Sequence, residues 1–181
     1  MNINEQIHIE PHNPKWHYLY EKEVRYLKQL QELSCLKFEH IGSTSIPNIK
    51  AKPIIDILIG IEQMPVSDDI IEALQKAGYI YMQDGSVADR RYFVKRSEVN
   101  YNIQIVVYGG RIWTDDLLFR DYLIEKPCKA IEYQRVKEQI IESGIKTLLE
   151  YSALKADFIT AIYAEIHSND NNIRYNSQCS D

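Results

Sequence analysis

The chain has 181 residues, of which 45% are hydrophobic and 26% are charged, and its formal net charge is −5 at pH 7. This length suits one domain with a core that folds unaided, and the mild negative charge argues against a dedicated nucleic-acid binder, because such domains are usually net basic. The longest apolar run, residues 54–61, contains an aspartate and is far too short to cross a bilayer, so no membrane partner is expected.

The first half of the chain predicts one helix and two strands. The helix is expected over residues 13–33, because Asn13 is a good N-cap, Pro14 suits the first helical position and apolar residues recur at helical spacing. The sequence LKFEHI at residues 36–41 predicts a strand. A second strand is expected over residues 53–62, and its weak alternation indicates that both of its faces are covered.

The second half predicts one further helix, three strands and three more helices. The first of these helices begins at Ser67 and ends near Gly78, and the next one opens on Thr114 as its N-cap. The strands are expected at residues 79–83, 90–96 and 101–108, and the last three helices at residues 114–126, 127–142 and roughly 147–166.

This order of elements predicts an α+β, or mixed α/β, fold, with a mixed sheet of about five strands, flanking helices and a C-terminal helical part. We expect a single domain over residues 1–166. The last segment, residues 167–181, is polar and is expected to be a flexible tail.

Asp56 stands out because it interrupts an apolar strand. A buried carboxylate is costly unless it is paired, hydrogen-bonded or bound to a metal. One interpretation is structural, with Asp56 near a strand end and accepting hydrogen bonds from loop amides. The other is functional, with Asp56 as a Mg²⁺ ligand and catalytic residue at the mouth of a phosphate site.

The loop before this strand favours the functional interpretation. Gly42 lets the backbone approach a bulky ligand. If a helical turn begins at Ser43, Thr44 and Ser45, its amides and hydroxyls can bind an anion. A Gly-Ser loop, a short helical connection and a strand with a buried acid together resemble the nucleotidyltransferase fold, in which the loop holds the triphosphate and strand carboxylates hold the metal.

The carboxylate set that this resemblance implies is incomplete. The pattern usually has two acids one residue apart on the strand, but the position that shares a face with Asp56 is Leu58. The neighbouring strand offers Gln104 and no acid, so two-metal phosphoryl transfer lacks ligands. Glu39 or His40 could complete a metal site only by pointing inward, and we expect His40 to be the more inward of the two.

The chain also resembles the GrpB family, which is assigned to the nucleotidyltransferase-like superfamily. HIGSTSIPNIKAKPIIDI at residues 40–57 matches the most distinctive motif of that family, and NPKW, RRYFVKR, YNIQIVV, LLFRDYL and YSALKADFI occur in the expected order. The resemblance covers nearly all of residues 7–166. It implies a fold and a pocket rather than a reaction, and it implies a histidine where this chain has Gln104.

Four basic residues could neutralise a bound phosphate. Lys52 directly precedes the second strand, and Arg91 and Lys95 share a strand face by the two-residue period. The resemblance draws attention to Lys155, because Y-x-x-x-K-x-x-F-I matches the closing motif of the family. Each of these residues could equally be a solvated cation or a structural bond partner.

Three hypotheses follow. The first is a nucleotide- or phosphate-binding protein in which the Gly42-Ser43 loop holds phosphate and Asp56 holds Mg²⁺, with catalysis weakened by the missing acids. The second is a non-catalytic module that binds a nucleotide or a coenzyme A derivative, since some relatives carry this domain fused to dephospho-coenzyme A kinase. The third is a structural or interaction protein.

The lack of a CxxC pair and of a visible signal peptide predicts a cytoplasmic protein, and the oligomeric state stays open.

Overall fold

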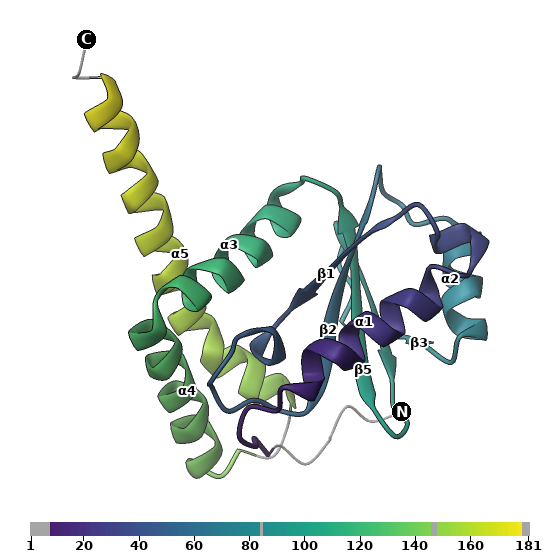
Figure 1. The fold of residues 1–181 in the computed structure, drawn as a ribbon, viewed down its shortest axis with the longest axis horizontal. Coiled ribbons are helices and arrows are strands. Elements are labelled where there is room, and N and C mark those ends of the chain that lie inside the picture. Colours follow the sequence, from purple (N-terminus) through teal and green to yellow (C-terminus); the bar gives the residue numbers. More distant parts are fainter. Residues whose placement is uncertain (1–7, 84, 146–147, 179–181) are drawn as a thin grey trace.

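The computed structural model describes residues 8–83, 85–145 and 148–178. Helices and strands are mixed in the first part of the chain, and three helices follow (Figure 1). Two 3₁₀ turns, Gln31–Leu33 and Ser43–Ser45, flank the first strand. The helices are α1 (Lys15–Leu27), α2 (Asp68–Lys76), α3 (Arg111–Glu125), α4 (Pro127–Glu142) and α5 (Leu148–Gln178), and the strands are β1 (Lys37–Ile41), β2 (Ile54–Ile61), β3 (Ile80–Tyr81), β4 (Arg90–Lys95) and β5 (Asn100–Val107).

The strands form one sheet in the order β1-β2-β5-β4-β3. The central neighbours β2 and β5 are parallel, and the other neighbouring pairs are antiparallel. A parallel pair needs a long crossover connection, and here α2, β3 and β4 lie between the two strands in the chain. The predicted α+β fold with a mixed sheet of about five strands is therefore confirmed.

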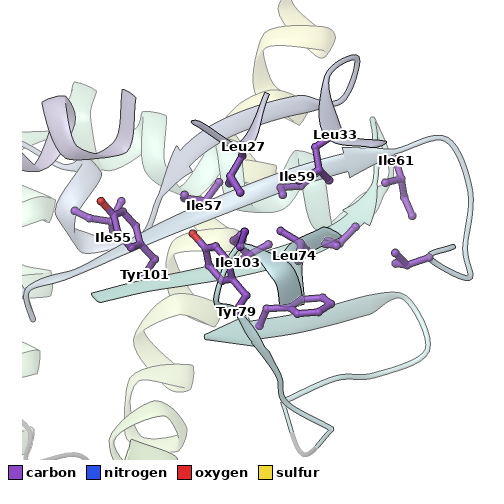
Figure 2. Close-up of a cluster of buried hydrophobic side chains, with 14 of the residues drawn as sticks. Leu27, Leu33, Ile55, Ile57, Ile59, Ile61, Leu74, Tyr79, Tyr101 and Ile103 are labelled. Atoms are coloured by element: carbon purple, nitrogen blue, oxygen red, sulfur yellow. The ribbon is translucent and has the colours of Figure 1, made fainter. Parts of the chain in front are cut away.

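One face of the sheet packs against α1 and α2 (Figure 1). β2 contributes Ile55, Ile57 and Ile59 to this face, because alternate residues of a strand point the same way. Leu27 of α1 and Leu74 of α2 close over them, and all five side chains are buried (Figure 2). This core directs the remaining residues of β2, including the aspartate of the strand, toward the opposite face.

The opposite face packs against α3, and α4 and α5 lie beside α3 (Figure 1). Trp113 of α3 packs in one cluster with Leu58 of β2. Gly60 permits this close approach, since a Cβ atom there would lie 2.9 Å from the Trp113 ring. A second cluster, which includes Leu123 of α3 and Tyr133 of α4, joins the helices to each other. A cavity that could bind a ligand lies between this helical layer and the sheet.

Two helix boundaries near the sheet differ from the prediction. α1 ends at Leu27, because Leu30 is extended and leads into the turn Gln31–Leu33. This break lets both Leu27 and Leu33 reach the core. α3 begins at Arg111 rather than at Thr114, since Gly110 and not a side-chain cap precedes it.

The last helix is longer than predicted. α5 runs to Gln178 instead of ending at residue 166, because residues 167–178 contain no proline or glycine that would stop it. The expected tail over 167–181 is therefore helical as far as Gln178, and its flexibility stays a prediction. Positions 147 and 179–181 lie outside the described residues. None of the described helices is long and apolar enough to cross a membrane.

Candidate functional site

Asp56 lies near the start of β2, in the interior of the sheet between β1 and β5. It pairs with Ile41 on β1 and with Asn102 on β5, and its side chain points toward the layer of α3, α4 and α5. Its chain neighbours Ile55 and Ile57 point into the opposite core. Strand alternation therefore forces this carboxylate into the space between sheet and helices.

A short hydrogen-bond relay holds the Asp56 carboxylate. Asn102 donates from Nδ2 to Asp56 Oδ1 over 2.7 Å, and Arg96 donates from Nη2 to Asn102 Oδ1 over 2.9 Å. The second bond fixes which way the Asn102 amide points. Burial raises the pKa of Asp56, whereas the Asn102 hydrogen bond and the nearby cations Lys155, Arg96 and Lys52 oppose this rise. The structural interpretation of Asp56 was thus right about buried hydrogen bonding, although the donor is a side chain and not a loop amide.

Replacing Asn102 with leucine should destabilise the protein by about 2 kcal/mol at neutral pH, because a buried carboxylate loses its donor. The loss raises the pKa of Asp56 further in the folded state only, so the destabilisation should grow as pH rises above 3.8, the ordinary value. Urea unfolding at about pH 4 and about pH 7 tests this. Asn100→Leu on the same strand is the control, and an equal cost of both variants at both pH values would contradict the role of Asn102.

Gly42 brings the loop backbone against Asp56. Its φ of 72° and ψ of −175° belong to a region that almost only glycine adopts. A Cβ atom at position 42 would overlap the Asp56 carboxylate and would lie 2.9 Å from its Cγ. The sequence predicted that Gly42 lets the backbone approach a ligand closely. In the structure, the group that the backbone of Gly42 approaches is the Asp56 carboxylate.

The three hydroxyls after Gly42 have different partners. Thr44 is buried, and its Oγ1 donates to the Ile54 carbonyl over 3.2 Å and contacts His40 Nε2 at 3.0 Å. Ser45 donates to the Gly42 carbonyl over 2.6 Å and does not line the cavity that lies between Asp56 and the helical layer. Ser43 does line it and donates to the hydroxyl of Tyr133 over 3.3 Å. Of the three, Ser43 is the hydroxyl placed to meet a ligand.

A cavity of about 300 Å³ opens between Asp56 and the helical layer. Its wall combines the loop, the four strands β1, β2, β4 and β5, and the helices α3, α4 and α5. Aromatic rings form much of the helical side, and carboxylates, amides and ammonium groups lie among them. The lining residues are Ile41, Gly42, Ser43, Thr44, Lys52, Ile54, Asp56, Tyr92, Asn102, Gln104, Asp116, Phe119, Tyr133, Tyr151, Lys155, Ile159 and Tyr163.

A second carboxylate, Asp116 of α3, lines the same cavity and was missed by the sequence analysis. Burial raises the pKa of Asp116 to about 6, Arg90 opposes the rise, and Asp115 and Asp56 add to it. Helical spacing could have located it, because Trp113 and Arg120 lie one turn away on the sheet side of α3. The sequence instead suggested a helix start near Thr114, which left Asp116 as an exposed first-turn acid.

Two of the four predicted phosphate-binding cations reach the cavity. Lys52 lies at its rim before β2, and Lys155 comes from α5, with its Nζ 4.5 Å from the centre of the Tyr151 ring. Arg91 and Lys95 point to the other face of the sheet. There Arg91 donates to the Val87 carbonyl over 2.6 Å, and Lys95 Nζ lies 2.9 Å from a carboxylate oxygen of Glu23.

Neither proposed additional metal ligand reaches Asp56. Glu39 lies 2.7 Å from Arg120 in an ion pair that is partly exposed. His40 is the more buried of the two, as expected, but it points to the α1 face and stacks on Tyr20 with 4.8 Å between ring centres. Burial lowers the pKa of His40 to about 3, so the ring is neutral.

The residues at the cavity fit a Mg²⁺ ion only in part. No group of three or more His, Cys, Asp or Glu side chains that could hold a metal exists within residues 8–83, 85–145 and 148–178. Mg²⁺ is commonly held by one or two carboxylates together with substrate phosphates. Asp56 can therefore supply one ligand. Gln104 lines the cavity as well, and its Oε1 accepts a hydrogen bond of 3.2 Å from Arg90 Nη1.

Comparison with known proteins shows the family and the fold of the chain. The chain is 33% identical to the GrpB protein of Enterococcus faecalis, whose crystal structure superposes with a TM-score of 0.78 and covers 90% of this chain and 98% of that one. It is 32% identical to YqkA of Bacillus subtilis over 85% of this chain and 45% of YqkA. It is 25% identical to a dephospho-CoA kinase of Mycolicibacterium paratuberculosis over 87% of this chain and 45% of the kinase. The chain thus spans about half the length of these last two proteins. The GrpB protein family model matches residues 6–165, and the chain belongs to the GrpB family.

Proposed function

We propose that the cavity binds a nucleotide or another phosphate-containing ligand. One observation carries this proposal: Ser43, Lys52 and Lys155 line the same cavity of about 300 Å³. Ammonium and hydroxyl groups are donors that bind phosphate oxygens. Five aromatic rings on the same wall offer flat surfaces on which a nucleobase can stack. The volume lies at the lower end of small-molecule sites and suits part of a nucleotide.

In this proposal Mg²⁺ enters together with the ligand. Asp56 supplies one oxygen ligand, and phosphate oxygens and water supply the rest. The cation would offset the cost of keeping Asp56 ionised while buried, which is the cost that raises its pKa. Asn102 would keep the carboxylate oriented in both states, because its donor bond needs no metal.

The small number of strand carboxylates at the cavity favours ligand binding without catalysis over catalytic turnover. Leu58 is fully buried in the position where a second strand acid is implied, so β2 offers no further ligand. A coenzyme A derivative is a specific candidate ligand, because the match to a dephospho-CoA kinase covers most of this chain.

We further propose that the protein is cytoplasmic. The exposed thiols Cys35 and Cys128 suit a reducing compartment.

Asp56→Asn should keep the fold and lose the metal-dependent part of ligand binding. We expect at least one nucleotide or coenzyme A species with Mg²⁺ to raise the melting temperature of the wild type. Ligand at about 100 times its Kd stabilises by about 2.7 kcal/mol, and the variant should lose most of this gain. A thermal-shift panel with nucleoside triphosphates and coenzyme A species, each with and without Mg²⁺, measures the effect.

Asp157→Asn is the matched control, because it removes an exposed carboxylate from α5 outside the cavity lining. It should respond to every ligand as the wild type does. An equal response of Asp56→Asn would exclude Asp56 as a metal ligand. If no ligand shifts the wild type and Asp56→Asn changes only its stability, Asp56 is structural, and a protein partner becomes the function to test.

A further inference from the structure

Asp116 shares the cavity with the groups proposed to bind phosphate. It projects from α3, whereas Ser43, Lys52 and Lys155 reach the same space from the loop, the start of β2 and α5. An ionised carboxylate in this position would repel a bound phosphate, and a protonated one could donate a hydrogen bond to it. The protonation state of Asp116 therefore decides whether it opposes or supports an anionic ligand.

The contacts of Asp116 favour the protonated form. Its Oδ2 is shielded from solvent and has no hydrogen-bond partner among the described residues. Arg90 is the cation that acts on it, but Arg90 donates from Nη1 to Gln104 over 3.2 Å, and its Nε is likewise shielded and unpartnered within the described chain. A carboxylate with one oxygen shielded from solvent and without a donor is costly to ionise.

Four titratable or charged groups face Asp116 from the elements around it. Arg90 of β4 favours its ionised form, while Asp115 of α3 and Asp56 of β2 oppose ionisation. Tyr163 of α5 stays neutral, because burial raises its own pKa. With desolvation as the largest cause, the pKa of Asp116 is about 6, so the ligand-free cavity changes charge close to neutral pH.

We propose that Asp116 is a ligand-binding residue of the cavity, and that the cavity takes up an anionic ligand together with one proton, which Asp116 holds. This inference rests on the proposed phosphate site. A bound anion adds negative charge beside Asp116, so proton binding to Asp116 and anion binding to the cavity favour each other. Above the pKa of free Asp116 the affinity should fall as pH rises, by up to about tenfold per pH unit when one full proton is taken up.

The test is isothermal titration calorimetry with dephospho-coenzyme A and with inorganic sulfate. Both ligands keep a constant charge between about pH 5.5 and about pH 8, so any pH dependence belongs to the protein. Titration in two buffers with different heats of ionisation gives the number of protons taken up per ligand. We expect uptake approaching one proton near pH 7 for the wild type.

Two neighbouring variants separate Asp116 from a general charge effect. Asp116→Asn should bind up to about a hundredfold more tightly than the wild type at about pH 8, about tenfold for each pH unit above the pKa of Asp116, with an affinity that no longer depends on pH and with no proton uptake. Asp115→Asn is the control, because Asp115 Oδ2 lies 3.3 Å from Arg111 Nη1 and outside the cavity lining. Because Asp115 adds to the rise in the pKa of Asp116, this variant should move the pH dependence to lower pH, but it should still take up close to one proton near pH 7.

The outcomes distinguish this inference from the function on which it rests. Binding to the wild type without proton uptake and with constant affinity overturns the role of Asp116 and leaves the phosphate site standing. The same pH dependence in Asp116→Asn also overturns it, and assigns the proton to another group. No binding of either ligand to wild type or Asp116→Asn at any pH, with or without Mg²⁺, overturns both.

Discussion

Gly42→Ala should destabilise the protein by about 4 kcal/mol and abolish binding at the cavity. Two costs add up at this position. The φ of 72° and ψ of −175° place it in a region that costs a residue with a side chain about 1–3 kcal/mol. The new methyl group would also overlap the Asp56 carboxylate, and such overpacking typically costs about 1–3 kcal/mol more. The loop and Asp56 must then move apart, which separates the proposed phosphate and metal ligands.

Gly109→Ala is the matched control for this prediction. Gly109 has a similar φ of 69°, but a Cβ atom there would meet nothing within 4 Å. Its substitution should cost only about 1 kcal/mol, the penalty of a left-handed φ. Urea unfolding of both variants gives the difference, and the thermal-shift panel gives the binding. Equal costs at the two glycines would mean that the loop does not press on Asp56 in the folded protein.

Much of the fold could be predicted because strand and helix periods are local properties of the chain. The apolar run of β2 indicated a strand covered on both faces, and Ile55, Ile57 and Ile59 on one side with Leu58 on the other confirm it. The break of α1 after Leu27 could not be read in the same way, because tertiary packing decides it. The continuation of α5 past residue 166 depends on the absence of a stop signal, which polar composition obscured.

The candidate site could be predicted only in its local part. The Gly42 loop and Asp56 lie close in the chain, so motif and alternation placed them together. The two-residue period correctly grouped Arg91 with Lys95, but a period does not say which face of a sheet meets a cavity. Here both lie on the face opposite the cavity, where Lys95 pairs with Glu23 of α1. Helical spacing could have placed Asp116 on the sheet side of α3, but its place in the cavity depends on the packing of α3 on the sheet, which is a long-range contact.

The second large effect on stability is expected at Lys137 of α4. This lysine has only 1% of its surface exposed. Its Nζ donates to the Lys50 carbonyl and lies 4.5 Å from the centre of the Tyr133 ring. Burial, the largest cause, and the nearby charge of Lys155 together lower its pKa from 10.5 to about 7, although Glu138 opposes the change. At neutral pH this amine is therefore about half neutral.

The lowered pKa of Lys137 makes the stability of the wild type depend on pH. Between about pH 7 and pH 10.5 the unfolded chain binds a proton that the folded protein does not, so stability should rise with pH in this window. The stability gained by the neutral amine is fully present above the unfolded pKa and is lost as pH falls to about 7. One pH unit corresponds to about 1.4 kcal/mol, so we expect a gain of about 2.5 kcal/mol from about pH 7.5 to about pH 9.5.

Lys137→Met should remove this gain, because methionine has a similar shape and no proton to bind. At about pH 6 the variant should be at least as stable as the wild type, since it buries no charge, and at about pH 9.5 it should be less stable by about 2 kcal/mol, because the Lys50 carbonyl loses its donor. Urea unfolding across this pH range measures both. Arg135→Met, which removes an exposed cation from the same helix, should leave the slope intact. A flat profile of the wild type would mean that Lys137 stays charged although it is buried, and would overturn this prediction.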